Sequence, residues 1–371
     1  MSDGQLATRL SREEIAKREI GHTDISRGLA WAMTCAFLAT LVVPPTVQLV
    51  ADLREGATSK PSAYGELLSG LPAVANEYVQ GTGNRWNRLL AANRRLLHEI
   101  EEYEKQLEDR SLLTGHLVGP TQQLLTDLAG LGNEKAFIGR DGWLFYRPDV
   151  EYLTGPGFLE PVTLGRRARG GKQHAAPPQP DPRPAILEFH EQLARRGIRL
   201  VLVPMPGKAA VHPDKLSTRF SSVDALLDNA SIEQFKQEMH KEGVLVFDPT
   251  SVLAERKVAS GGASQFLRTD THWTPAAMQA VAEGLQEFIN LQCPLPDQQP
   301  VDYGERILEI ENLGDIAAML HLPEQQTLFL PEKVAIRHVV QPDGNPWEPD
   351  ESADILLLGD SYANIYSLPE L

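Results

Sequence analysis

Residues 354–362 have the sequence DILLLGDSY, and this stretch decides how the C-terminal half of the chain folds. Its apolar run at 355–358 is typical of a buried strand. A glycine and a small polar residue follow the run, so a bend at the end of the strand would present the hydroxyl of Ser361. Serine needs an adjacent base to act as a nucleophile. The stretch therefore predicts a strand with a candidate nucleophile at its carboxyl end.

A candidate base lies upstream, in the segment DTHW at residues 270–273. The pKa of histidine lies near neutrality, which suits His272 to take a proton from a serine. In a loop, the carboxylate of Asp270 can reach back to the imidazole two residues away and fix its tautomer. Singly, Asp270 can instead cap the helix that starts near Pro275, and His272 can be a packed histidine. The joint occurrence of the motifs favours a Ser-His-Asp unit for acyl transfer.

The region around these motifs alternates between helical and extended patterns. Helices are expected at 185–196, 232–242 and 275–289, and strands at 198–204, 244–248 and 355–358. Strands that alternate with helices of this length indicate a parallel sheet with flanking helices, and hence an α/β fold. Ligands of such sheets bind beyond the carboxyl ends of the strands, where Ser361 is expected. Two short strands around an Asp-Gly turn, over 137–146, are expected near the start of this domain.

The N-terminal part of the chain has a different pattern. Residues 28–51 carry no charge, and 29–50 are long and apolar enough for one transmembrane helix. Basic residues are more frequent before this segment than after it, so residues 1–28 are predicted to form a cytoplasmic tail and the rest of the chain to lie outside. Residues 51–130 are expected to form a helical stalk or linker.

An amphipathic helix is predicted within that stalk, over residues 84–110. Apolar side chains recur along it at spacings of three and four, among them Trp86, Leu90, Leu97 and Ile100, and charges occupy the other face. This stripe is interpreted as a packing surface, either of a stalk or against the domain that follows. A coiled coil is an alternative, for which the run is short.

The charge balance and the cysteines bear on partners and cofactors. The chain has 35 basic and 50 acidic residues. Phosphate binding needs clustered lysines and arginines, so nucleic acid is not expected as a partner. Cys35 lies in the apolar segment and Cys293 far beyond it, so no disulfide is expected between them. Because no Cys/His cluster has metal-ligand spacing, we expect no structural zinc and no cofactor.

The two motifs resemble the signatures of the SGNH hydrolase-like domain of bacterial alginate O-acetyltransferases. In that family the Asp-His pair precedes the serine along the chain, the reverse of ordinary SGNH esterases, and this sequence has the same order. Two further segments are similar, GRDGWLF at 139–145 and VPMPGK at 203–208. The resemblance implies a flavodoxin-like parallel sheet with flanking helices in residues 131–371, and the apolar N-terminal segment matches the membrane-anchored branch.

The resemblance also implies an activity. Ser361 would take an acetyl group, His272 would deprotonate the serine, and Asp270 would orient the imidazole. A hydroxyl of an exported, alginate-like polysaccharide would then accept the acetyl group in the periplasm, beyond the inner membrane. The implied partners are a multi-span membrane acyltransferase that delivers the acetyl group and other polysaccharide export proteins.

Two alternatives stay open at this point. Water in place of the sugar hydroxyl would make the chain a carbohydrate acetylesterase with the same chemistry. The chain also ends at Leu371, a turn or two after Ser361, whereas family members continue further, so the SGNH-like domain is expected to be truncated at its C-terminus. That expectation favours the second alternative, an inactive binding or scaffold subunit of an exopolysaccharide export complex.

Overall fold

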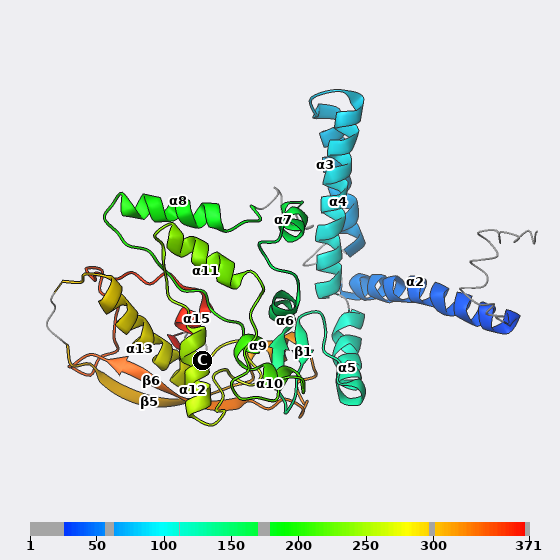
Figure 1. Cartoon of the computed structure of the whole chain (residues 1–371). Coiled ribbons are helices and arrows are strands. Elements are labelled where there is room, and N and C mark those ends of the chain that lie inside the picture. The colour runs from blue at the N-terminus through cyan, green and yellow to red at the C-terminus, as the bar shows by residue number, and fades with distance from the viewer. Residues whose placement is uncertain (1–25, 56–62, 111, 170–178, 297–300, 368–371) are drawn as a thin grey trace, which may run out of the picture. The chain divides into compact units, whose positions relative to one another are not determined.

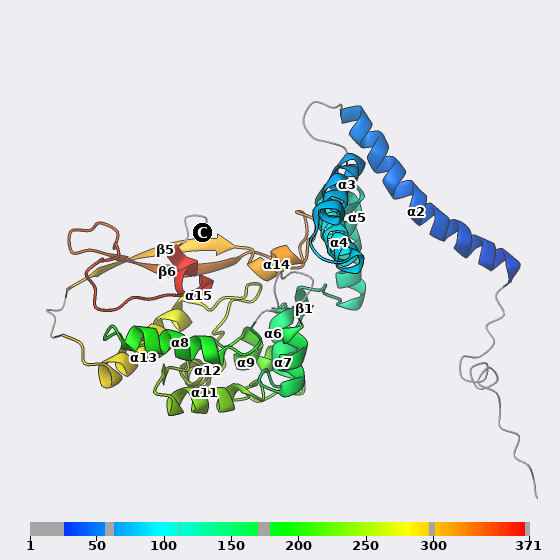
Figure 2. The same cartoon turned by 90° about the horizontal axis from the view of Figure 1, so that it is seen from above.

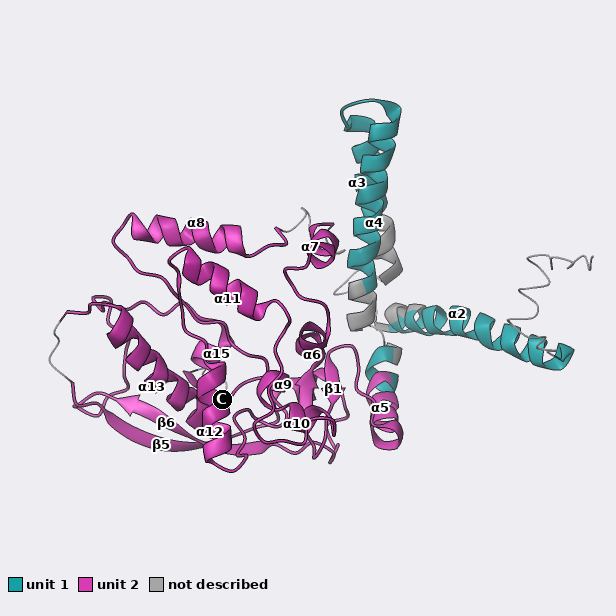
Figure 3. Cartoon of the chain, viewed as in Figure 1, with its two compact units in different colours: residues 1–117 teal, residues 118–371 magenta. Residues whose placement is uncertain are grey.

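The structure is a computed structural model that describes residues 26–55, 63–110, 112–169, 179–296 and 301–367. These residues belong to two compact units, unit 1 at 1–117 and unit 2 at 118–371 (Figure 1, Figure 3). The predicted cytoplasmic tail lies almost entirely outside the described residues. The division between the units falls within the residue range of helix α5 (Leu112–Ala129), and the domain limits expected from the sequence stay a prediction.

Unit 1 begins with one long apolar helix, α2 (Arg27–Glu55). Its stretch Arg27–Gln48 has 22 residues with a mean hydropathy of 1.6, and none of it is buried. By length and composition this helix can cross a bilayer. It overlaps the segment 29–50 that the sequence predicts to be transmembrane.

The next two helices of unit 1, α3 (Ala63–Gln80) and α4 (Arg85–Arg110), form an antiparallel hairpin (Figure 1). Asn84 caps α4, because its side-chain oxygen accepts a hydrogen bond from the backbone N–H of Asn87 at 2.9 Å. Helix α4 confirms the amphipathic helix predicted over 84–110.

After the C-terminal part of α5, unit 2 continues with the predicted pair of short strands, β1 (Ala136–Ile138) and β2 (Leu144–Tyr146), which are antiparallel. Asp141 and Gly142 join them with φ angles of 56° and 77°. Positive φ at both central residues is the requirement of a type I′ turn, which an Asp-Gly pair meets at low cost. The hairpin prediction is confirmed.

The helices and strands of the α/β part follow in alternation. In chain order they are α6 (Arg147–Thr154), α7 (Pro161–Ala168), α8 (Arg183–Ala194), β3 (Val201–Leu202), α9 (Lys208–Val211), α10 (Pro213–Leu216), α11 (Ile232–Lys241), β4 (Leu245–Val246), α12 (Thr250–Ala259) and α13 (Pro275–Gln292). Strands β3 and β4 pair in parallel, Val201 with Leu245 and Leu202 with Val246. The predicted helices and the parallel pairing are confirmed, although both strands are shorter than expected.

The prediction of a buried strand at 355–358 is wrong for this structure. The run belongs to no strand, and its four side chains are 52% to 81% exposed. An apolar run becomes a buried strand only when a neighbouring strand pairs with its backbone and other elements cover its faces. Among the described residues, β3 pairs with β4 and not with this run.

A long antiparallel hairpin follows α13 in unit 2, formed by β5 (Gly304–Asn312) and β6 (Glu332–Val340). It lies on the opposite side of unit 2 from α11 (Figure 2). The helix α14 (Asp315–Met319) follows directly after β5. The hairpin was not predicted, because its apolar residues do not alternate strictly with polar ones: Ile307 and Leu308 are adjacent, and so are Val339 and Val340.

The main apolar core of unit 2 lies beside the DTHW segment. It joins buried aromatic rings from several elements, including Trp143, Phe145, Phe247, Phe266 and Trp273. Since Trp273 is itself part of this cluster, the core anchors the segment that carries the candidate base.

Candidate active site

The loop over residues 266–273 has a fixed shape because of its own sequence. Thr274 caps α13 through its side-chain oxygen, which ends the loop at a defined residue. Phe266 and Trp273 pair through an isolated antiparallel bridge, and both of their rings are buried. The bridge and the cap together set the backbone of the Asp-His pair.

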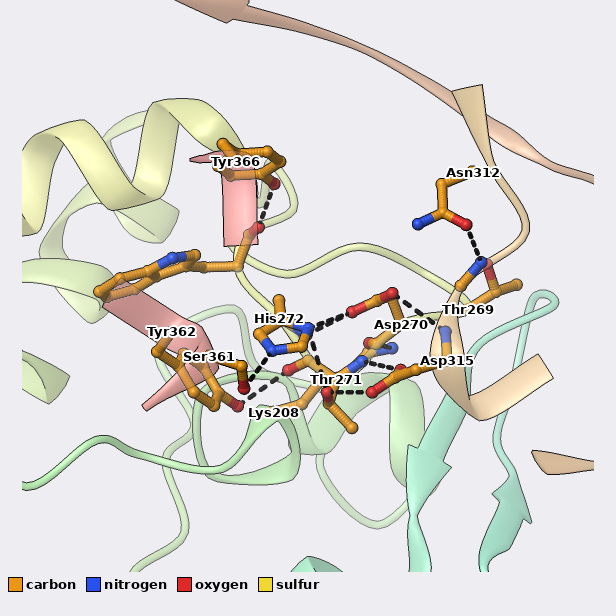
Figure 4. Close-up of polar contacts among 12 residues, drawn as sticks. Lys208, Thr269, Asp270, Thr271, His272, Asn312, Asp315, Ser361, Tyr362 and Tyr366 are labelled. Atoms are coloured by element: carbon orange, nitrogen blue, oxygen red, sulfur yellow. Dashed lines mark hydrogen bonds and ion pairs between the residues drawn. The ribbon is translucent and has the colours of Figure 1, made fainter. Parts of the chain in front are cut away.

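His272 lies between Asp270 and Ser361 (Figure 4). Its Nδ1 is 2.6 Å from Oδ1 of Asp270, and its Nε2 is 2.7 Å from Oγ of Ser361. The backbone N–H of His272 also donates to Oδ1 of Asp270 at 2.8 Å. With Nδ1 facing the carboxylate, Nε2 is the nitrogen that can accept the serine proton. The structure thus brings together all three residues that the sequence singled out.

Two tyrosines hold the serine segment against the loop. Ser361 begins the short helix α15 (Ser361–Asn364), and a 3-10 turn, η1 (Ile365–Ser367), follows it. The hydroxyl of Tyr362 donates to the backbone carbonyl of residue 271 at 2.9 Å, and the hydroxyl of Tyr366 donates to that of Trp273 at 2.6 Å. The tyrosines were missed by the sequence analysis, although the sequence shows them one and five residues after the serine, one helical turn apart.

The backbone N–H that follows the serine is already engaged. Asp360 caps α15, because its Oδ1 accepts the N–H of Tyr362 at 3.0 Å. Donors that stabilise a tetrahedral oxyanion must be aimed at the reacting carbonyl. The N–H of Tyr362 is therefore directed to the cap and away from that task.

A second carboxylate, Asp315 at the start of α14, supports the loop (Figure 4). Its backbone N–H donates to Oδ2 of Asp270 at 3.0 Å. Its own carboxylate accepts the backbone N–H of Thr271 at 2.7 Å and the Thr271 hydroxyl at 2.6 Å. Gly314 makes this approach feasible, because its φ is +91° and an added Cβ would lie 2.5 Å from the carbonyl oxygen of residue 269. The Gly-Asp pair at 314 and 315 is the sequence signal that could have indicated the role of Asp315 at this site.

A buried lysine supports the loop from the other side. Lys208 is 2% exposed, and its Nζ donates to the carbonyls of Leu144 at 2.6 Å, Arg268 at 2.8 Å and Asp270 at 3.0 Å. Three acceptors match the three N–H groups of an ammonium. Burial lowers the pKa of Lys208 to about 7, and the nearby carboxylates, Asp270 first, oppose that shift. Lys208 therefore ties strand β2 and the DTHW loop together.

The charges of the Asp-His pair are set by burial and by hydrogen bonding, which act in opposite directions. Burial lowers the pKa of His272, but its hydrogen bond to Asp270 and the charges of Asp270 and Asp315 leave that pKa above its ordinary value of 6.5. Burial raises the pKa of Asp270, but hydrogen bonds from His272 and from the backbone of Asp315 leave it below its ordinary value. For Asp315, burial and the charge of Asp270 raise the pKa. Asp270 is therefore ionised at neutral pH, beside a histidine that holds its proton to a higher pH than usual.

Three of these side chains also lie close enough to hold a metal ion. One ligand atom each from Asp270, His272 and Asp315 lies within 4.8 Å of the others. Oxygens of both carboxylates already accept hydrogen bonds from within the loop, and Nε2 of His272 meets Ser361. A bound cation would compete with these contacts, so the arrangement fits proton transfer better than metal binding.

A serine hydroxyl that meets an Asp-His pair on a mixed α/β domain is the arrangement of SGNH hydrolase-like domains. Residues 136–369 match the family described as SGNH hydrolase-like domain, acetyltransferase AlgX. The match covers more than half of the chain and includes both motifs. The chain therefore belongs to this family of acetyltransferases.

Individual proteins of known name are similar to the chain over most of its length. It is 27% identical to the probable alginate O-acetylase AlgJ of Pseudomonas aeruginosa over 304 residues, which cover 81% of this chain and 70% of the relative. It is 26% identical to that of Azotobacter vinelandii over 243 residues, 64% of this chain and 56% of the relative. The chain thus matches little more than half the length of the second relative.

The chain was also compared with solved structures. The O-acetyltransferase domain of Pseudomonas putida AlgJ superposes with a TM-score of 0.42 at 22% identity, and the superposition covers 57% of this chain and 67% of that one.

Proposed function

We propose that the chain is an O-acetyltransferase that acetylates an exported, alginate-like polysaccharide through an acetyl-Ser361 intermediate. The observation that carries the proposal is the 2.7 Å distance between Nε2 of His272 and Oγ of Ser361, with Asp270 on the other side of the imidazole. Membership of an acetyltransferase family supports the reaction, and the name of the relatives, alginate O-acetylase, supports the polysaccharide.

The reaction has two half-reactions that use the same residues. In the first, Nε2 of His272 takes the proton of Ser361, Oγ attacks the acetyl carbonyl, and the proton passes to the leaving group of the donor. In the second, a sugar hydroxyl gives its proton to Nε2 and attacks the acetyl ester, and the proton returns to Oγ. Asp270 stabilises the imidazolium that forms in each half-reaction and keeps its charge throughout.

We propose the inner membrane as the location. Helix α2 would cross the bilayer once, with the N-terminus in the cytoplasm and unit 2 in the periplasm, as the excess of basic residues before the apolar segment suggests. The acetyl donor would then have to reach the periplasm through a multi-span membrane acyltransferase. The acceptor would come from the export machinery of the polysaccharide.

One observation favours a second candidate, a carbohydrate acetylesterase. Ser361 is exposed, and so is the run at 355–358 that precedes it. Water therefore has access to an acetyl-serine in the chain alone, and transfer to a sugar requires that the acceptor or a partner exclude it.

Acetyl labelling tests the proposal. The folded chain is incubated with p-nitrophenyl acetate, and intact-mass and peptide spectra locate the added acetyl group. We expect one acetyl on Ser361, no uptake by Ser361→Ala, and transfer from the serine to alginate oligosaccharides in competition with water. Equal labelling of Ser361→Ala would refute the mechanism. A folded chain that takes up no acetyl would support the scaffold alternative, and release only to water would support the esterase.

A further inference from the structure

Helix α4 leaves an apolar stripe open to solvent. Trp86 is 72% exposed, and Leu90 and Leu97 are each 57% exposed. Together with Asn93 and Ile100 they recur at alternating spacings of four and three, which is the a/d repeat of a coiled coil. These five residues are called the α4 stripe below. An exposed apolar patch of this kind on a helix marks an interaction site.

The contact with α3 uses another face of α4. Ala92 is buried at 7% exposure, the guanidinium of Arg88 lies over the ring of Tyr78 at 5.7 Å, and Gly70 of α3 lies against Glu99. On a helical wheel at 100° per residue, the positions 88, 92 and 99 lie about 120–160° from the centre of the α4 stripe. Helix α3 thus covers one face of α4, and the α4 stripe has no packing partner within the described residues.

The charges of α4 are divided along its length. Its first half, 85–97, carries four arginines and no acidic residue. Its second half, 98–110, carries five glutamates and Asp109 beside Lys105 and Arg110, so its net charge is negative. A parallel neighbour with this charge distribution would set like charges against each other. An antiparallel copy of the same helix would set each basic half against an acidic half.

We propose that the α4 stripe is covered by α4 of a second copy of this chain, in an antiparallel pair with a two-fold axis between residues 97 and 100. In this register Leu97 faces Ile100 of the second copy, and Asn93 faces Glu104. Apolar side chains therefore meet apolar ones, and the polar pair can form a hydrogen bond that fixes the register. A shift of the axis by one turn toward the N-terminus would instead place Leu97 against Asn93.

The flanking charges select the same register. Arg94 and Glu101 each follow a stripe residue directly, so both lie on the edge of the stripe away from α3. With the axis between residues 97 and 100, Arg94 of one copy lies beside Glu101 of the other, and two-fold symmetry repeats the pair. The two hairpins together then form a four-helix arrangement.

A charge swap tests this pairing on the full chain in detergent micelles, by sedimentation velocity over a range of concentrations. We expect a dimer whose dissociation constant rises about tenfold in Arg94→Glu and in Glu101→Arg, because two symmetric attractions become repulsions. The double variant, which restores both pairs with reversed signs, should return to within about threefold of the original. Arg95→Gln is the control, because its side chain lies opposite the stripe and pairs with Glu99 of the same helix, and it should leave the dimer unchanged.

A further substitution tests the same pairing through the apolar contact, in case the charge swaps change the dissociation constant only slightly. Leu97→Glu places a charge in the centre of the stripe, where the side chain is exposed, and should give a monomer with an unchanged helical circular dichroism spectrum. A chain that is monomeric throughout would overturn the proposal, and so would a double variant no better than either single one. A monomer that binds anionic vesicles through the stripe would assign the surface to the membrane instead.

Discussion

Asp270 and His272 are embedded in the core of unit 2, whereas Ser361 is exposed and is held against them by the hydroxyls of two tyrosines and by the packing of Ile365 into the same core. Asp270 is 3% and His272 is 7% exposed, and their loop receives hydrogen bonds from Lys208 and from Asp315. The serine segment follows a run that is exposed and unpaired. We call the loop of Asp270 and His272 the base half of the site and the segment of Ser361 the nucleophile half. From this difference we expect changes in the base half to affect stability and activity together, and changes in the nucleophile half to affect mainly activity.

The largest expected effect comes from removing the base. His272→Ala should lower the rate of acetyl uptake from an activated ester by about 10⁴-fold or more, because Ser361 is left without a proton acceptor. Asp270→Ala should lower it less, since the carboxylate orients the imidazole and does not transfer the proton. Because the residues act as a unit, the double variant should be little slower than His272→Ala. Stopped-flow measurement of the acetylation burst provides the rates, and additive losses would contradict a shared role.

The next effect concerns stability in the base half. Lys208→Met keeps the length of the side chain but leaves three carbonyls without their donor, and should lower the free energy of unfolding by about 3 kcal/mol. Lys215→Met is the matched control, since that lysine pairs with exposed Asp141 and should cost less than about 1 kcal/mol. Ser361→Ala should change stability by less than about 0.5 kcal/mol. Urea unfolding followed by circular dichroism measures all three, and a loss in Ser361→Ala as large as that in Lys208→Met would remove the distinction between the halves.

The candidate nucleophile and the candidate base were predictable because each is part of a short local pattern. Asp270 and His272 are two residues apart, and Ser361 follows a glycine at the end of an apolar run. Lys208 and Asp315 were not assigned to the site, since their roles depend on backbone groups that are distant in sequence. The strand expected at 355–358 failed for the opposite reason. Its apolar composition is local, but burial depends on neighbours that pack against it.

A smaller effect concerns the pH profile. The negative charge of Asp315 contributes to raising the pKa of His272, and the imidazole must be neutral to accept the serine proton. Acetylation should therefore increase with pH, with a midpoint above 6.5. Asp315→Asn removes one charge that favours the imidazolium, so the midpoint should move to lower pH. The control is Asp343→Asn, in an exposed turn, which should leave the midpoint in place. A shift to higher pH in Asp315→Asn would show that this carboxylate does not act through the charge of His272.

The smallest effect tests how the serine segment is held. Tyr366→Phe removes one hydroxyl that donates to the carbonyl of Trp273 at 2.6 Å, and keeps the ring and its packing. The loss of one partly buried hydrogen bond should cost about 1 kcal/mol. If that contact positions Ser361, acetylation should slow by about three- to tenfold, because a loosened nucleophile spends less time at Nε2 of His272. Tyr303→Phe, which alters an exposed ring on another segment, should leave the rate unchanged. A stability loss in Tyr366→Phe with an unchanged acetylation rate would show that other contacts position the serine. The nucleophile half would then contribute to stability as the base half does, and the two halves would differ less than their hydrogen bonds indicate.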